Sequence, residues 1–370
     1  MHGFRKILAI AATLAALVVL NVVFESGVGA FQVNPYYARI IDLIGINVTL
    51  AVSLNLVNGL AGQFSLGHAG FMAVGGYTAT YVTVAHGAAI AGLAGGTLDG
   101  GVGAFVAMLV SLICGAAAAA LAGFLVGVPS LRLKGDYLAI VTLGFGEIIR
   151  VVILNIPAVG GATGFTDAIP LTTFFWIFAV AVLTIAIVRN IAASTFGRAL
   201  AAIRGDEIAA EAMGVRTTRY KVLAFVISSA LAGVAGGLSG QLFANPLNPQ
   251  QLNFMKSIEV VVMIVIGGIG SITGAVFGAG ILTVLPEALR SVDQQFPGLR
   301  MVLYALLLIL FMIFRPQGLF GRREIGWAWL RLPNRTKIPV ALSDAADARQ
   351  HTGRRPVDRR STLGGSDTDD

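Results

Sequence analysis

Groups that could do chemistry are sparse in this sequence, and they do not form a catalytic or metal-binding set. Among its 370 residues are one cysteine, Cys114, and four histidines. No group of His, Cys and carboxylate residues has the spacing of metal ligands. The phosphate-binding loop Gly-x-x-x-x-Gly-Lys-Ser/Thr does not occur either, so the chain cannot bind and hydrolyse ATP by the usual means. We therefore expect no catalytic residue, no metal and no cofactor.

The most concentrated polar groups accompany a glycine-rich interruption at 58–70, between apolar segments at about 40–59 and 67–85. Backbone groups freed by a helix break at membrane depth are tolerated only where protein or water satisfies them. The polar side chains here either line a translocation path or cap broken helices, while the glycines allow close packing. The candidates are Asn55, Asn58, Gly62, Gln63, Ser65, Gly67 and His68.

Two of these candidates carry more specific expectations. For His68, a structural hydrogen bond is a better interpretation than a proton relay. We expect bulky substitution at Gly62 or Gly67 to block passage, because a broken helix there needs close backbone approach.

Glu147 lies deep in a further apolar segment, at about 137–156. An ionisable group at that depth is costly and is by default a functional candidate. Arg150 follows three positions later, close enough on a helix to pair with it. We favour an ion pair that fixes a helix interface over a role in the translocation path.

The segment 197–218 is charged, unlike the apolar sequence around it, and has a modest apolar face. A short exposed helix of this kind can dock in a groove on a partner protein. The alternative is a helix that rests on lipid headgroups, although its acidic residues would then face anionic lipid. The residues expected to make the partner contact are Arg204, Asp206, Glu207, Ala209, Ala210, Glu211 and Gly214.

The composition places these groups in a membrane protein. Apolar residues make up 56% of the chain and charged residues only 12%, with a mean hydropathy of +0.81. Soluble domains carry about 25% charged residues. The net charge of +7 does not indicate nucleic-acid binding, because the basic residues flank apolar spans.

Apolar segments long enough for membrane helices recur along the chain, since each crossing needs roughly 20 apolar residues. The first follows Arg5 and Lys6, and we interpret it as an uncleaved signal anchor in preference to a cleaved signal peptide. The segments lie at about 7–24, 40–59, 67–85, 104–127, 137–156, 172–189, 219–241, 258–284 and 299–314.

The basic residues predict the orientation of these segments. Most of the 26 lysines and arginines lie in the N-terminus, the loops near 129–136 and 189–221, and the tail after 314, which we place in the cytoplasm. Both termini are then cytoplasmic, so the number of crossings is even. The segment 258–284 contains the interruption Gly267-Gly268-Ile269-Gly270-Ser271, and neither piece comfortably spans about 30 Å. We expect a broken hairpin that enters and returns on the outer side, or two short tilted spans.

Several longer motifs resemble a known family. Glu207 to Gly214 is similar to the coupling loop of ABC importer permeases, although Ile208 stands between the glutamate and the alanine pair. The chain also resembles branched-chain amino acid permeases of the LivM type in four motifs that occur in the same order, at residues 59–68, 131–144, 197–225 and 315–320. The resemblance covers about 1–322.

This resemblance implies a permease subunit of a bacterial ABC importer in the inner membrane. Its partners would be a LivH-like permease, two cytoplasmic ATP-binding subunits and an extracytoplasmic substrate-binding protein. The segment 207–214 would meet an ATPase, and the solute would be a branched-chain amino acid. Permeases for urea, amides or aromatic acids are alternatives, as is a stand-alone ion-coupled carrier, although Glu147 would be its lone deep acidic group.

We therefore expect an all-α integral membrane protein, a helical bundle of about 8–10 transmembrane segments with broken or re-entrant helices. A transmembrane domain at 1–321 would include the cytoplasmic coupling segment 197–218. The basic remainder, 322–370, is expected to be a disordered cytoplasmic tail that contributes to orientation and is attracted to anionic lipid.

Overall fold

Helices dominate the part of the chain that the computed structural model describes. The described residues are 21, 34–98, 100–133, 135–166, 168–242, 247–290, 298–315, 317–321 and 324. The longer helices are α2 (Pro35–Asn55), α3 (His68–Leu93), α4 (Gly101–Ser130), α5 (Asp136–Leu154), α6 (Phe174–Ala193), α9 (Thr217–Gly240), α10 (Phe254–Gly267), α11 (Ile272–Ala288) and α13 (Leu299–Phe314). Shorter elements are the π-helix η1 (Leu56–Leu60), the 3-10 turns η2 (Pro157–Val159) and η3 (Gly161–Thr163), and the helices α7 (Thr195–Gly205) and α8 (Glu207–Ala212).

These helices confirm the all-α fold class. Five described helices are long and apolar enough to cross a membrane: α2 with η1, α4, α5, α6 and α9. The apolar segments predicted at 67–85, 258–284 and 299–314 correspond to α3, to α10 with α11, and to α13. The predicted signal anchor at 7–24 lies outside the described residues, apart from Asn21.

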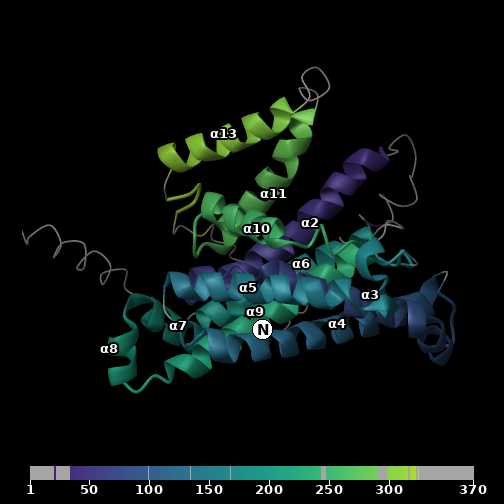
Figure 1. The fold of residues 1–370 in the computed structure, drawn as a ribbon, viewed down its shortest axis with the longest axis horizontal. Helices are drawn as coiled ribbons and strands as arrows, with labels where there is room; N and C mark the ends of the chain where they lie inside the picture. The colour runs from purple at the N-terminus through teal and green to yellow at the C-terminus, as the bar shows by residue number, and fades with distance from the viewer. Residues whose placement is uncertain are drawn as a thin grey trace, which may run out of the picture. The chain divides into compact units, whose positions relative to one another are not determined.

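Helices α3, α4 and α9 are in close backbone contact with one another, and α4 and α9 run side by side (Figure 1). A Cβ built on Gly75 of α3 would lie 2.1 Å from the Cα atom of Gly233 in α9. One built on Gly115 of α4 would lie 2.7 Å from the carbonyl oxygen of Gly75. Lipid is as apolar as leucine, so membrane helices associate through this kind of tight packing between small residues. The glycine content of these helices therefore determines how closely they pack.

Both predicted interruptions are present as breaks between helices. After α2 the chain loosens into η1, then runs without helical structure from 61 to 67 before α3 begins. The second break separates α10 from α11 at residues 268–271. Its first residue, Gly268, has a φ of +113°, which L side chains rarely adopt. We call these the first break (residues 56–67) and the second break (residues 268–271).

Candidate functional site: the two breaks and the coupling segment

The two breaks meet each other, although more than 200 residues separate them in sequence. Asn55 is fully buried at the end of α2. Its Oδ1 accepts a hydrogen bond from the Gly270 amide at 2.9 Å, and its Nδ2 donates to the Ser271 carbonyl at 3.1 Å. A Cβ on Gly59 would lie 2.7 Å from the Gly270 nitrogen. One asparagine thus satisfies backbone groups that the second break leaves free, and a glycine allows the two segments to touch.

Inside the first break, the predicted polar residues satisfy local groups. Asn58 accepts from the Ser65 amide at 3.1 Å and donates to the Ser65 carbonyl at 3.4 Å, so its side chain closes the loop. His68 lies 2.9 Å from the Ser53 hydroxyl, which confirms the structural hydrogen bond expected for this histidine. The side chain of Asn58 can bind both backbone groups of Ser65 because the amide of an asparagine both donates and accepts hydrogen bonds.

The glycines of the first break differ in their surroundings. Gly67 is buried, and a Cβ there would lie 2.4 Å from the Thr142 carbonyl oxygen in α5. Gly62 is exposed with a φ of +67°, and a Cβ there would lie 2.8 Å from Cγ of Arg204. Gln63 is half-buried and donates to the Ala61 carbonyl at 3.4 Å. Both glycines named as sensitive from the sequence therefore have a close neighbour, which is a backbone carbonyl at Gly67 and the Arg204 side chain at Gly62.

The chain after α13 returns to the second break. The Leu319 amide donates to the Ile266 carbonyl at 2.8 Å, and the Phe320 amide to the Gly267 carbonyl at 3.2 Å. Glu324, just beyond the expected domain boundary, accepts from the amides of Ile272 and Thr273 at 2.6 and 3.3 Å. A carboxylate at a helix N-terminus is favoured by the unpaired amides and by the helix dipole. Glu324 thereby caps α11 from a distant part of the sequence.

Glu147 forms the predicted ion pair. Its Oε2 lies 2.7 Å from Nε of Arg150, with both side chains about a quarter exposed. Its Oε1 also accepts from the Phe254 amide at 3.2 Å, so it caps the first turn of α10. Glu147 lines a narrow cleft between α3, α5 and the start of α10, together with Leu66 and Ser257. The pairing confirms the ion pair predicted from the sequence, and the contact with Phe254 joins α5 to α10.

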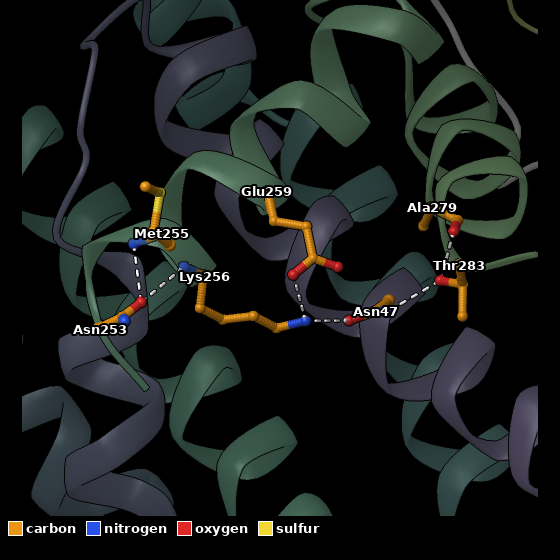
Figure 2. A network of polar contacts seen from close by, with 7 residues as sticks. All are labelled: Asn47, Asn253, Met255, Lys256, Glu259, Ala279 and Thr283. Atoms are coloured by element: carbon orange, nitrogen blue, oxygen red, sulfur yellow. Dashed lines mark hydrogen bonds and ion pairs between the residues drawn. The ribbon is translucent and has the colours of Figure 1, made fainter. Parts of the chain in front are cut away.

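A second polar network, not expected from the sequence, joins α2 to the hairpin of α10 and α11 (Figure 2). The ammonium group of Lys256 lies 3.1 Å from Glu259 and donates to Asn47 Oδ1 at 3.2 Å. Asn47 in turn donates to the Thr283 hydroxyl at 2.8 Å. Asn47 and Asn55 both lie on α2, so the hairpin is tied to this helix in two places. The available sequence signal was two opposite charges three positions apart within an apolar region.

The coupling segment contains a short helix whose ends are both capped. Asp206 is the N-cap of α8, and its Oδ1 accepts from the amides of Ile208 and Ala209 at 2.9 and 3.0 Å. At the other end, the amide of Gly214 donates to Glu211 at 2.9 Å and that of Val215 to the carbonyl of Ala210 at 3.0 Å. This is the Schellman pattern, and it requires the left-handed φ of +84° found at Gly214.

The two glutamates of α8 fasten it to α9. Glu207 Oε2 lies 2.7 Å from Nζ of Lys221, whose side chain is only 2% exposed. Glu211 accepts from the hydroxyl of Thr217 at 2.5 Å. The sequence identified both acids but missed Lys221, a charged residue near the start of an apolar helix. In this structure both carboxylates bind residues of the same chain, Lys221 and Thr217.

What α8 presents outward is mainly apolar. Ile208 is 74% exposed and Met213 is 84% exposed, and Ala209 between them is exposed as well. Ala210 is buried against the core. In Figure 1, α8 lies beyond α7 at one end of the bundle. We call Ile208, Ala209 and Met213 the outer face of α8.

Arg204 links α7 to the first break. Its guanidinium Nη1 donates to the carbonyl oxygen of Gly59 at the end of η1. The predicted coupling segment and the predicted break, which Arg204 and Gly59 join across 145 positions in sequence, therefore lie in direct contact.

Comparison with known proteins adds to this geometry. A family model described as "Branched-chain amino acid transport system / permease component" matches residues 36–312. The LivM permease protein of the high-affinity branched-chain amino acid transport system of Escherichia coli (strain K12) is 33% identical over 349 residues, covering 83% of this chain and 74% of LivM. The LivH permease protein of the same organism is 39% identical over 132 residues, covering 36% of this chain and 42% of LivH.

Among solved structures, an inward-facing conformation of a metal-chelate type ABC transporter matches with a TM-score of 0.41 and 17% identity, covering 82% of this chain and 98% of that one. The family match extends from α2 to α13 and so includes both breaks and the coupling segment. The chain, a multi-pass membrane protein, therefore belongs to the family of branched-chain amino acid transport system permease components.

Proposed function

We propose that this protein is the membrane permease subunit of an ABC importer for branched-chain amino acids in a bacterial inner membrane. The observation that carries the proposal is the direct contact of an exposed, capped segment with the backbone of the first break, which Asn55 joins to the second. A permease needs a place to receive energy and a membrane element that can rearrange. The relatives named above transport branched-chain amino acids, which supports that solute class.

The energy source in this proposal is a pair of separate ATP-binding subunits. The outer face of α8 would insert into a groove on one of them, while Asp206, Glu207, Glu211 and Gly214 keep α8 in the required position. Apolar side chains on a short helix are the usual anchors for a hydrophobic groove. A LivH-like permease would be the second membrane subunit of the importer. An extracytoplasmic binding protein would deliver the solute.

The first break would form part of the translocation path in this proposal. Gln63 and the exposed Gly62 are its accessible candidates, whereas Asn55, Asn58, Ser65, Gly67 and His68 shape the break from within. Glu147 lies near the break, in the cleft that Leu66 also lines. These residues would mainly shape the path and would make few direct contacts with the solute.

The second break would lie toward the cytoplasmic end, since Gly270 adjoins the side chain of Arg204. Helices α10 and α11 have 14 and 17 residues, so they are about 21 and 25 Å long. These lengths support two short spans, joined by a shallow re-entrant loop that lies next to the coupling segment. Both chain termini would then be cytoplasmic.

The proposed function is tested by reconstituting the chain with a LivH-like permease, two ATP-binding subunits and a branched-chain amino acid binding protein from the same organism. We expect ATP-dependent uptake of radiolabelled leucine into proteoliposomes, competed by isoleucine and valine. Uptake that proceeds without the ATP-binding subunits, driven by a proton or sodium gradient, would contradict the proposal. Uptake of urea or an aromatic acid in place of leucine would keep the transporter class and overturn the solute.

Replacing both Ile208 and Met213 by aspartate is expected to reduce co-purification of the ATP-binding subunits at least about tenfold, because two apolar anchors of an interface core are lost. The change adds no strain within the chain, since both side chains are exposed. Co-purification on tagged permease measures the effect. Tyr137 to aspartate is the control, because Tyr137 is 73% exposed on α5 and lies outside the coupling segment. Equal loss in both variants would contradict docking at α8.

A further inference from the structure

The side chain of Arg204 reaches from the coupling segment to both breaks. Its Nη1 donates to the carbonyl of Gly59 in the first break. Its stem lies along Gly62, where a Cβ would be 2.8 Å from Cγ of Arg204. In the second break, a Cβ on Gly270 would lie 2.8 Å from the same Nη1 atom. One guanidinium group is therefore adjacent to the backbone of each interruption.

A guanidinium suits this position for electrostatic reasons. The last carbonyls of a helix have no partner within the helix and carry the negative end of its dipole. Arginine is always charged and presents several donors in one plane, so it can hold such a carbonyl while resting on a second segment. Gly62 and Gly270 have no side chains, which leaves room for Arg204 beside each break.

The breaks are already joined to each other, because Asn55 bonds to Gly270 and Ser271. Arg204 adds a connection from this pair to α7. From α7 the chain passes directly to Asp206, whose amide donates to the Ala202 carbonyl at 3.1 Å and whose side chain starts α8. A displacement of α8 therefore has a short and continuous route to both breaks.

We propose that Arg204 is a positioning residue for energy coupling, which fixes the two helix breaks to the coupling segment so that all three move as one unit when an ATP-binding subunit moves α8. This inference rests on the proposed function. Arg204 would link ATP hydrolysis to rearrangement of the path. Neither the outer face of α8 nor the residues of the first break would provide this link by themselves.

The test uses the complete reconstituted importer, with leucine as the transported probe, and compares Arg204→Ala, Arg204→Lys and Arg132→Ala. Arg132 is exposed beyond the end of α4, so Arg132→Ala removes a comparable charge from a different basic loop. We expect Arg204→Ala to lower leucine uptake per ATP hydrolysed about tenfold, through loss of a charged hydrogen bond. Arg204→Lys should be intermediate, and Arg132→Ala should match the unsubstituted protein. An unchanged ratio in Arg204→Ala would overturn the inference, as would a loss of uptake and ATP hydrolysis in equal proportion.

A second measurement does not depend on the solute. Spin labels are placed on Phe64 of the first break and on Ala212, the last residue of α8, which are both exposed and lie outside the outer face of α8, after Cys114 is replaced by alanine. We expect a narrow distance distribution that ATP does not change in the unsubstituted chain, and a broad one in Arg204→Ala. Equal distributions in both proteins would overturn the inference. Failure of leucine uptake in the unsubstituted importer would instead count against the proposed function, while the label distances still test Arg204.

Discussion

Glu207→Gln is expected to destabilise the packing of α8 against α9 by about 3 kcal/mol, the lower end of the range for breaking a buried ion pair. The glutamate itself retains some contact with water, but the Lys221 side chain is only 2% exposed. Without the carboxylate, the ammonium group stays buried beside a neutral amide. The measurement is the free energy of unfolding of the detergent-solubilised chain, followed during titration with a denaturing detergent.

Two further variants show whether the stranded lysine causes this loss. Glu207→Gln combined with Lys221→Met removes the buried charge as well, and should recover most of the stability, because replacing a whole buried pair is often neutral. Glu211→Gln is the matched control in the same helix. Its partner is the neutral Thr217 hydroxyl, so the cost should be only about 1 kcal/mol. If Glu207→Gln is no worse than Glu211→Gln, Lys221 does not depend on Glu207.

Charge reversal at Glu207 combined with loss of Gly214 is expected to uncouple ATP hydrolysis from uptake, because both residues hold α8 in place. Glu207 holds α8 against α9, and Gly214 supplies the left-handed residue that ends α8. Both substitutions would displace the outer face of α8 without removing a contact to the partner.

Local features of the molecule were predictable from the sequence. Apolar length predicted the long helices, because each apolar span must satisfy its backbone internally. The glycine-rich stretches predicted both breaks. The spacing of Glu147 and Arg150 predicted their ion pair, since residues three apart on a helix are neighbours.

Contacts between distant segments were not predictable in the same way. Nothing local to Asn55 indicates that it bonds to Ser271, and Glu324 stands in a basic region that reads as a tail. Lys221 carried a usable signal, a charge near the start of an apolar helix, but its partner depends on how α8 folds back. Helical periodicity can be recognised in a single sequence, whereas such pairings arise only when the helices pack.

Asn55→Ala is expected to separate the two breaks and to cost about 3 kcal/mol, because a partly buried amide and a buried carbonyl would each lose a partner. The groups are the Gly270 amide and the Ser271 carbonyl, and Asn55 itself is fully buried. Asn55→Asp should be nearly as damaging, since it keeps the acceptor, loses the donor and adds a charge away from water. Spin labels on Phe64 and Ile269, which are 41% and 39% exposed, report the distance between the breaks.

Asn58→Ala is the comparison that separates joining of the breaks from simple loss of hydrogen bonds. Asn58 is also a buried asparagine with two backbone bonds, but both of its partners belong to Ser65 in the same loop. Its removal should cost comparable stability while leaving the mean distance between Phe64 and Ile269 in place. A distance that lengthens equally in both variants would mean that the first break is held by its own loop. A change confined to Asn55→Ala would mean that the two interruptions act as one element of the path.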